Sequence, residues 1–214
     1  MQSQRNRTAD DEGLAVVPDE IAIVDSGGAN LASLQIALHR LGRQAVVTDR
    51  AWQIQQARHV LLPGVGSAAA AMERLRKAAL VDLIVELRQP VLGICLGMQL
   101  LFERSAEGDE QCLGVLPGIV GRIAPANHLP VPHMGWNQLA VARADPLLKG
   151  VTSGEYVYFV HSYAAAPNEH TLATTEYGVP LAAAVRRNNF WGTQFHPERS
   201  GQIGARILAN FLEV

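Results

Sequence analysis

The amino-acid sequence predicts an α/β protein with a central, mostly parallel sheet flanked by helices and with antiparallel additions in its C-terminal half. Two observations lead to this fold class. In the first half of the chain, short apolar runs alternate with longer amphipathic runs, which is the pattern of strand–helix–strand units. In the second half, the apolar segments are short and separated by turn residues, which is typical of antiparallel strands.

The composition is that of one compact domain with a substantial core, because 48% of the 214 residues are hydrophobic and 18% are charged. The net charge of −2 lacks the positive excess of proteins that bind nucleic acid or anionic membranes, so we expect neither as a partner. The two cysteines, Cys95 and Cys112, are too few for a disulfide framework or a four-cysteine zinc site. We therefore expect no metal, no cofactor and a reducing cytoplasmic environment.

The N-terminal 19 residues are expected to form a flexible extension, and residues 20–214 a single domain. The extension mixes charged and polar residues around a short apolar patch and lacks the apolar core of a signal peptide. Two arginines would suit a transit peptide, but three acidic residues at positions 10–12 argue against one. No later apolar run is long enough to span a bilayer.

The first half of the chain contains four expected strands joined by helical segments. The first strand, EIAIVD, is an apolar run closed by SGG, and the helix after it carries leucines at nearly helical spacing and ends at Gly42. The expected order is strand 20–25, helix 30–41, strand 45–48, helix 51–57, strand 59–62, a long helix over about 68–88 and strand 91–94. Ligand chemistry is expected at the carboxyl ends of these parallel strands.

The second half contains six short expected strands and a closing helix. The strands span 119–123, 137–141, 156–160, 172–176, 182–186 and 190–195. Several of them alternate or are aromatic and are interpreted as antiparallel additions to the sheet. The closing helix, 201–212, places Ile203, Ile207, Leu208 and Phe211 on one face.

The segment GICLG places Cys95 between two glycines, after a buried strand and before an amphipathic run that predicts a helix. This is the layout of a nucleophile elbow, G-x-S-x-G, with sulfur in place of oxygen. The start of a helix favours a thiolate, and the Leu96 N–H is placed to donate to an oxyanion. A small cysteine buried in the core explains this segment equally well, so both interpretations remain open.

The segment QFHPERS supplies a proton carrier that a thiolate nucleophile would need. His196 follows an expected strand, and Glu198 lies two residues further on, across a proline that restricts the turn. Alone, His196 would more often be a capping or surface histidine. Together with Cys95 it favours catalysis, because both residues follow predicted strands.

The segment LPGVG ends another strand, and its glycines let the N–H groups of Gly64 and Val65 approach a substrate oxygen closely. An ordinary strand-to-helix turn is the alternative. An acyl enzyme needs a second oxyanion donor, which this loop could supply.

These segments, with PHMGWNQ and YFVHSY, resemble in order and over nearly the whole chain from Ile21 the class I (triad) glutamine amidotransferases. The combination of PGVG, PHMGWN and YFVHSY is similar to the glutaminase subunits of imidazole glycerol phosphate synthase, an enzyme of histidine biosynthesis. The resemblance implies a glutaminase that hydrolyses L-glutamine and passes the ammonia to a partner.

The resemblance also implies roles for individual positions. Cys95 would form a glutamyl thioester, His196 would carry the proton and Glu198 would orient His196. The oxyanion hole would consist of Gly64, Val65 and Leu96, and glutamine would be bound by Gly66, Gln99, Glu107, Ser162 and Tyr163. Glu103 fits a substrate role no better than a position on the helix surface or at its cap.

The implied partner is a (β/α)8-barrel cyclase subunit, which would use the ammonia to make imidazole glycerol phosphate and aminoimidazole carboxamide ribotide. By the same resemblance Asn30, Trp136, Tyr158 and Arg199 would face this barrel, with core packing as the alternative for the two aromatic residues. Relatives often carry lysine at the position of Arg199. The oxyanion loop 63–66 would complete the site only in the activated complex.

Two other classes of function remain open. One is a cysteine-elbow hydrolase or another amidotransferase, serving pyridoxal phosphate or guanylate synthesis, against which MGWN and FVHSY argue. The other is a catalytically silent binding subunit, against which the intact set of Cys95, His196 and Glu198 argues.

Overall fold

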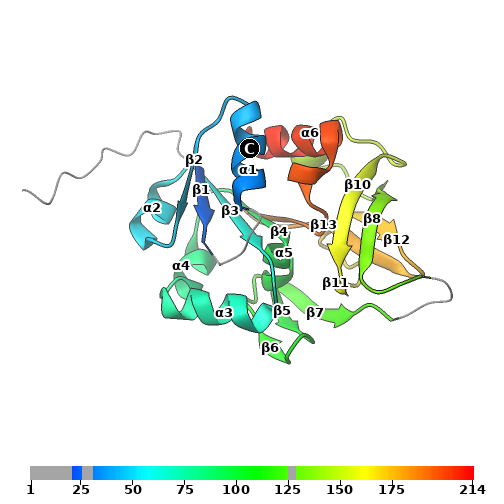
Figure 1. Cartoon of the computed structure of the whole chain (residues 1–214), viewed down its shortest axis with the longest axis horizontal. Helices are drawn as coiled ribbons and strands as arrows, with labels where there is room; N and C mark the ends of the chain where they lie inside the picture. The colour runs from blue at the N-terminus through cyan, green and yellow to red at the C-terminus, as the bar shows by residue number, and fades with distance from the viewer. Residues whose placement is uncertain (1–20, 26–30, 125–128) are drawn as a thin grey trace, which may run out of the picture.

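The computed structural model describes residues 21–25, 31–124 and 129–214. Its centre is a sheet of eight strands in the order β2-β1-β3-β4-β14-β13-β12-β9 (Figure 1). The strands from β2 to β14 run parallel, and β13, β12 and β9 are added antiparallel, which confirms the predicted fold class. The bounds are β1 (Ile21–Val24), β2 (Ala45–Thr48), β3 (His59–Gly64), β4 (Val91–Cys95), β9 (Ala140–Val141), β12 (Thr171–Glu176), β13 (Pro180–Arg187) and β14 (Phe190–Thr193). The expected extension 1–19 and Asn30 lie outside the described residues.

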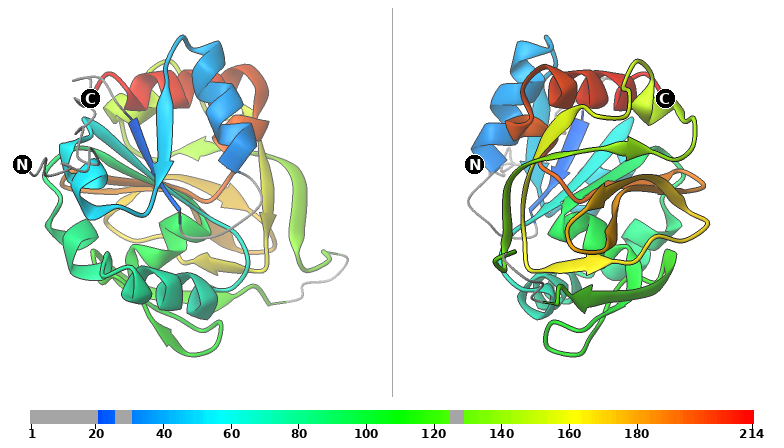
Figure 2. Two further views of the ribbon diagram at one scale, coloured as in Figure 1. Left: turned by 60° about the vertical axis from the view of Figure 1, so that its left-hand side comes forward. Right: turned by 90° about the vertical axis from the view of Figure 1, so that its right-hand side faces the viewer.

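Helices cover both faces of this sheet (Figures 1 and 2). The side chains of Ile21 and Ile23 in β1 belong to one face of the sheet, which α1 (Leu31–Arg40) and α6 (Gly201–Phe211) cover. The alternate residues of β1 belong to the opposite face, covered by α2 (Ala51–Gln56), α3 (Ala68–Lys77) and α4 (Val81–Glu86). Both sets are apolar because the strands are buried on both sides.

The long helix predicted over 68–88 is wrong, because the structure has α3 and α4 in its place. Helix α3 ends in a Schellman arrangement, in which the N–H groups of Ala79 and Leu80 donate to the carbonyls of Arg76 and Leu75 at 3.0 and 2.9 Å. Ala79 adopts a φ of 54°, a conformation that usually requires glycine. The apolar spacing continues across this break, so the sequence pattern gives no sign of it.

Strands β13, β12 and β9 are antiparallel additions to the central sheet, as expected, but the other C-terminal strands are placed differently. Strand β14 joins parallel to β4, and two further sheets lie beside the central one. One has the order β11-β7-β5-β6 and consists of β5 (Phe102–Ser105), β6 (Glu110–Gln111), β7 (Leu116–Arg122) and β11 (Tyr163–Ala165). The other is a two-stranded antiparallel ribbon of β8 (His133–Gln138) and β10 (Tyr156–His161), hereafter the β8–β10 ribbon.

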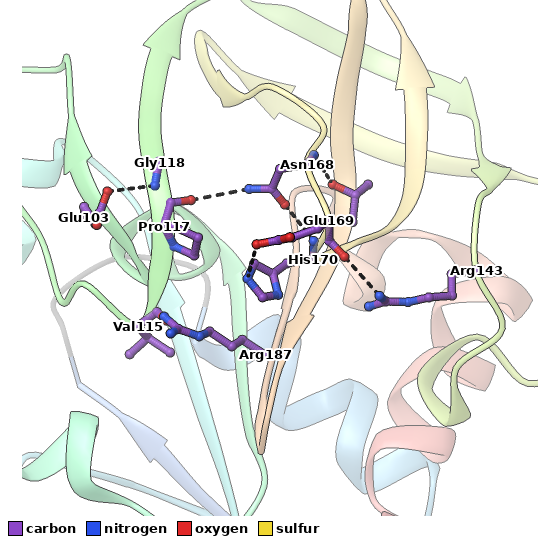
Figure 3. Close-up of polar contacts among 10 residues, drawn as sticks. Glu103, Val115, Pro117, Gly118, Arg143, Asn168, Glu169, His170 and Arg187 are labelled. Atoms are coloured by element: carbon purple, nitrogen blue, oxygen red, sulfur yellow. Dashed lines mark hydrogen bonds and ion pairs between the residues drawn. The ribbon is translucent and has the colours of Figure 1, made fainter.

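Glu103 lies in β5 rather than on a helix, so the alternative of a helix-surface or capping position is wrong. Its Oε2 accepts the N–H of Gly118 at 2.9 Å (Figure 3). One residue earlier in β7, the carbonyl of Pro117 accepts a hydrogen bond from the side-chain amide of Asn168 at 3.4 Å (Figure 3). Glu103 therefore holds the start of β7 in place.

In the part of the chain that the structure describes, the helices fall short of the length and apolarity that a membrane crossing requires.

Candidate active site

Cys95 lies at a sharp corner between β4 and the short helix α5 (Leu96–Leu100). Its backbone has φ 54° and ψ −110°, a strained conformation for a residue with a side chain. Such strain persists only where the surroundings enforce it, and it is concentrated at functional sites. The corner expected from the sequence is therefore present, with the cysteine at its tip.

The two flanking glycines are required by close backbone contacts. A Cβ atom on Gly93 would lie 2.6 Å from the carbonyl oxygen of Gly97, and one on Gly97 would lie 1.6 Å from that of Leu62. Both distances are far below van der Waals contact. Glycine at these positions lets α5 start directly against β3 and β4.

The amphipathic helix expected after Cys95 is instead five residues long and buried throughout. It ends early because later backbone groups bind its last carbonyls: the N–H of Leu113 donates to Leu100 and that of Leu116 to Leu101, at 2.9 and 2.7 Å. Helix α5 is thus enclosed between the central sheet and the β5–β7 strands. Its residues Leu96 and Gln99 face the site.

Strand β14 brings His196 next to Cys95. It pairs parallel with β4, and Thr193 lies opposite Ile94, so both chains leave the sheet at the same edge. His196 is the third residue after the end of β14, and Glu198 lies in the 3-10 turn η2 (Pro197–Arg199). The expectation that Cys95 and His196 follow the carboxyl ends of strands is confirmed.

His196 is buried and held by Glu198. Its Nδ1 lies 2.8 Å from Oε1 of Glu198, whose side chain is 3% exposed, and Cys95 lies on the other side of the ring. Burial alone would lower the pKa of His196, but the hydrogen bonds and charges of Cys95 and Glu198 outweigh burial and raise this pKa to about 10. The imidazolium form is thus favoured beside a cysteine.

A cavity of about 580 Å³ opens at this corner. It is lined by all ten of the expected site residues that belong to the nucleophile, the proton carrier, the oxyanion hole and the substrate contacts: Gly64, Val65, Gly66, Cys95, Leu96, Gln99, Glu107, Ser162, Tyr163 and His196. Glu198 lies behind His196, and Arg199 lines the rim. The volume is suited to a small metabolite.

Two of the polar lining residues are held by the backbone. Glu107 accepts the N–H of Ala68 through Oε2 at 2.8 Å, at the start of α3, which suits a carboxylate. Gln99 donates through Nε2 to the carbonyl of Tyr163 at 2.8 Å. Both side chains are thereby fixed in the cavity before any ligand arrives.

Sequence reasoning missed two polar residues of this region, Gln194 and His161. Gln194 is fully buried and contacts both Gln99 and Cys95, while His161 lines the cavity. Gln194 precedes His196 by two residues, so a polar residue inside an expected buried strand was the signal available for it.

The β8–β10 ribbon presents an aromatic face close to the cavity. Trp136 is 55% exposed and meets Tyr158 edge to face at 6.0 Å, which rules out core packing for the tryptophan. The guanidinium of Arg199 lies 5.2 Å from the centre of the Tyr158 ring. Met134 and Tyr156, two exposed residues that sequence reasoning missed, extend this face.

Among the described residues, no group of three or more histidine, cysteine or acidic side chains is arranged to hold a metal ion.

Comparisons with known proteins agree with this geometry. Residues 22–214 match the model of the family "Glutamine amidotransferase class-I". The chain is 51% identical to imidazole glycerol phosphate synthase subunit HisH of Xanthomonas axonopodis pv. citri (strain 306) over 91% of this chain and 98% of that protein. It is also 51% identical to the subunit HisH of Idiomarina loihiensis, over 91% of this chain and 97% of the relative.

Solved structures share the fold at lower identity. A glutamine amidotransferase crystal structure superposes with a TM-score of 0.70 at 23% identity, covering 90% of this chain and 97% of the other. PurLQS from Thermotoga maritima gives a TM-score of 0.68 at 20% identity, covering 92% and 99%. The chain belongs to the class-I glutamine amidotransferase family and, within it, to the HisH subunits of imidazole glycerol phosphate synthase.

Proposed function

We propose that this chain hydrolyses L-glutamine and delivers the ammonia to a cyclase subunit that makes imidazole glycerol phosphate and aminoimidazole carboxamide ribotide in histidine biosynthesis. The observation that carries this proposal is a cavity of about 580 Å³ that Cys95 and His196 both line, with Glu198 2.8 Å from Nδ1 of His196. The identity of 51% to HisH subunits supports the pathway. The amidotransferase domain would span 20–214.

In the first step, His196 takes the thiol proton of Cys95, and the Cys95 sulfur attacks the side-chain amide carbon of glutamine. The tetrahedral intermediate collapses when its C–N bond breaks, and His196 gives the leaving nitrogen a proton, so ammonia departs and a glutamyl thioester remains. His196 then takes a proton from water, which attacks the thioester and releases glutamate with the free thiol. Glu198 fixes the imidazole through its 2.8 Å contact with Nδ1.

The negative oxygen of both tetrahedral intermediates needs donors. Leu96 N–H lies at the start of α5, and Gly64 pairs with Cys95 across β3 and β4. We assign the oxyanion hole to these two residues and Val65, in the loop that would change on activation. Glutamine's amino and carboxylate groups would contact Gly66, Gln99, Glu107, Ser162 and Tyr163, all of which line the cavity.

Ammonia is a nucleophile only while unprotonated, so a channel into a partner avoids its loss to water. We assign the partner surface to the exposed face of the β8–β10 ribbon with Arg199, and the partner to a (β/α)8-barrel cyclase subunit. Asn30 would join this surface, although it lies outside the described residues. Both cysteines of the chain are free thiols, which agrees with a cytoplasmic location.

Glutamate release from glutamine tests the proposal. It is measured for this chain alone, with a HisH-compatible cyclase subunit, and with cyclase plus its nucleotide ligand, each alongside Cys95→Ala. We expect strong activity only in the full mixture, abolished by Cys95→Ala, with Cys112→Ala as the matched control that keeps activity.

High activity of the isolated chain would contradict activation by the partner while keeping the chemistry. No activity in any mixture would contradict the proposal and favour a silent binding subunit.

A further inference from the structure

The direction of each hydrogen bond around Gln194 follows from one backbone carbonyl. The oxygen of Tyr163 can only accept, so the atom of Gln99 at 2.8 Å from it must be the amide nitrogen Nε2. The same nitrogen lies 3.0 Å from Gln194, so the atom of Gln194 that faces it is the oxygen Oε1. The other end of the Gln194 amide is therefore the donor Nε2, and it points at Cys95 Sγ at 3.8 Å.

Gln194 has no contact with water, because its relative exposure is 0%. A buried amide destabilises the folded protein unless its donors and acceptors are bonded. The side-chain bonds of Gln194 go to Gln99 and Cys95. A polar residue in this place is therefore explained by the sulfur and by the glutamine that orients it.

The Cys95 sulfur lies between one group that favours the protonated thiol and one that favours the thiolate. The carbonyl oxygen of Val160 is 3.7 Å from Sγ and can be approached only by a protonated thiol. The Gln194 amide donates toward the same atom and so favours the thiolate. Without this donor, the Val160 carbonyl would still lie beside the sulfur and favour the protonated thiol.

Resting on the proposed function, we infer that Gln194 is a further catalytic residue, whose side-chain N–H stabilises the Cys95 thiolate and whose orientation is set by Gln99 and the Tyr163 carbonyl. Gln99 then acts both on the substrate and, through Gln194, on the nucleophile. The pair would hold the sulfur ready before glutamine enters.

Alkylation of Cys95 by iodoacetamide tests this inference without glutamine or a partner. The rate is followed from pH 5 to 9 by peptide mass spectrometry, which separates Cys95 from Cys112. In Gln194→Met, the rate at pH 7 should fall about tenfold, as expected for loss of a hydrogen bond to a charged group, and the rate curve should move to higher pH. In Gln194→Glu, a carboxylate facing the sulfur should move the curve further.

The other titratable or charged groups near the sulfur are unchanged in these variants: Glu107, His161, Tyr163, His196 and Arg199 in the cavity, and Glu198 behind His196. A shift of the curve therefore reports the amide. Gln202→Met, on the exposed surface of α6, is the matched control and should keep the wild-type curve.

Gln99→Met provides a second route, because it leaves Gln194 in place but removes the bond that orients it. It should shift the alkylation curve in the same direction as Gln194→Met. Wild-type alkylation curves in both Gln194 variants would overturn the inference even if the protein hydrolyses glutamine. Failure of the proposed function would instead appear as a wild-type protein that releases no glutamate with its cyclase.

Discussion

Single residues at the corner around Cys95 set both the backbone geometry of the site and the protonation state of His196. Gly97 allows α5 to lie against β3, and His196 carries a raised pKa because of the groups that it contacts. Each of these statements predicts the effect of one substitution.

The backbone contact at Gly97 leaves no room for a methyl group. Gly97→Ala should lower the free energy of unfolding by at least about 3 kcal/mol, because the new Cβ would lie 1.6 Å from the Leu62 carbonyl oxygen and main chain would have to move. Urea unfolding measures the effect. Gly121→Ala is the matched control, since a Cβ on Gly121 would meet no atom within 4 Å; equal losses in the two variants would refute the argument.

The pKa of His196 should depend on its neighbour across the site. Burial lowers it, while hydrogen bonds with Cys95 and Glu198 raise it to about 10, so Cys95→Ala should bring the pKa down toward or below the ordinary 6.5. Histidine NMR titration measures this change.

The pKa of His196 is higher in the folded protein than in the unfolded chain, so its proton stabilises the fold fully below about pH 6.5. This stabilisation is lost as pH rises through about 10. An unchanged pKa in Cys95→Ala would contradict the contact.

A site residue could be identified from the sequence when the residues that it contacts lie close to it along the chain. Cys95 has both glycines within two positions, so its corner could be predicted. His196 and Glu198 share one short turn. Gln194, by contrast, acts through Gln99 on α5 and through Cys95, and sequence spacing gives no sign of those distant contacts.

At the scale of elements, strand β10 is bonded to the turn that carries His196. The N–H of His196 donates to the Tyr158 carbonyl, and the Tyr158 N–H donates to Ser200 Oγ, both at 2.9 Å. Ser200 Oγ in turn donates to the His196 carbonyl at 2.7 Å. The proposed partner surface and the proton carrier thus share direct backbone contacts.

Binding of the cyclase should depend on the exposed face of the β8–β10 ribbon. Trp136→Ala should weaken the complex about 30-fold, because a large aromatic at the centre of an interface contributes about 2 kcal/mol, and should leave folding stability nearly unchanged. Titration calorimetry with the cyclase measures the affinity. Trp52→Ala, a 41% exposed tryptophan on α2, is the matched control. If both variants bind like the wild type, the ribbon is not the interface.

Elements were predictable where a boundary residue marks them. Strand β2 has the bounds expected from the sequence, and Gly42 correctly marks the end of the helix before it. The division between α3 and α4 was not predictable, because Ala79 takes the backbone role of a glycine. The separate small sheets depend on which strands meet after folding, which alternation along one strand does not specify.

For the whole molecule, a buried histidine pair joins the β8–β10 ribbon to the cavity. His161 Nδ1 donates to the Tyr163 carbonyl at 2.8 Å, so its Nε2 accepts from His133 Nδ1 at 2.9 Å, and His133 Nε2 accepts from Asn137 at 3.2 Å. These directions require both rings to be neutral. Burial accordingly lowers the pKa of each ring to about 4.

This pair should make the whole fold sensitive to acid. As pH falls from about 6.5 toward 4, the unfolded chain takes up protons that the folded pair cannot bind. The contribution of the neutral pair to folding stability is therefore fully present above about pH 6.5 and is lost as pH falls toward 4. In His133→Gln, the loss of unfolding free energy between pH 7 and 5 should be smaller than in the wild type by about 1 kcal/mol or more. Urea unfolding at the two pH values measures it. His39→Gln, at an exposed site on α1, should keep the wild-type difference.

The central position of β14 also sets the order in which the molecule can be completed during synthesis. The first four parallel strands emerge from the ribosome long before β14, and until Thr193 has been made the edge of β4 next to the nucleophile lies unpaired. An open strand edge invites pairing with other chains, so the nascent protein is most exposed to aggregation during this interval. Chains that terminate before β14 should therefore aggregate as well as lack activity, because the strand that covers this edge also delivers the histidine.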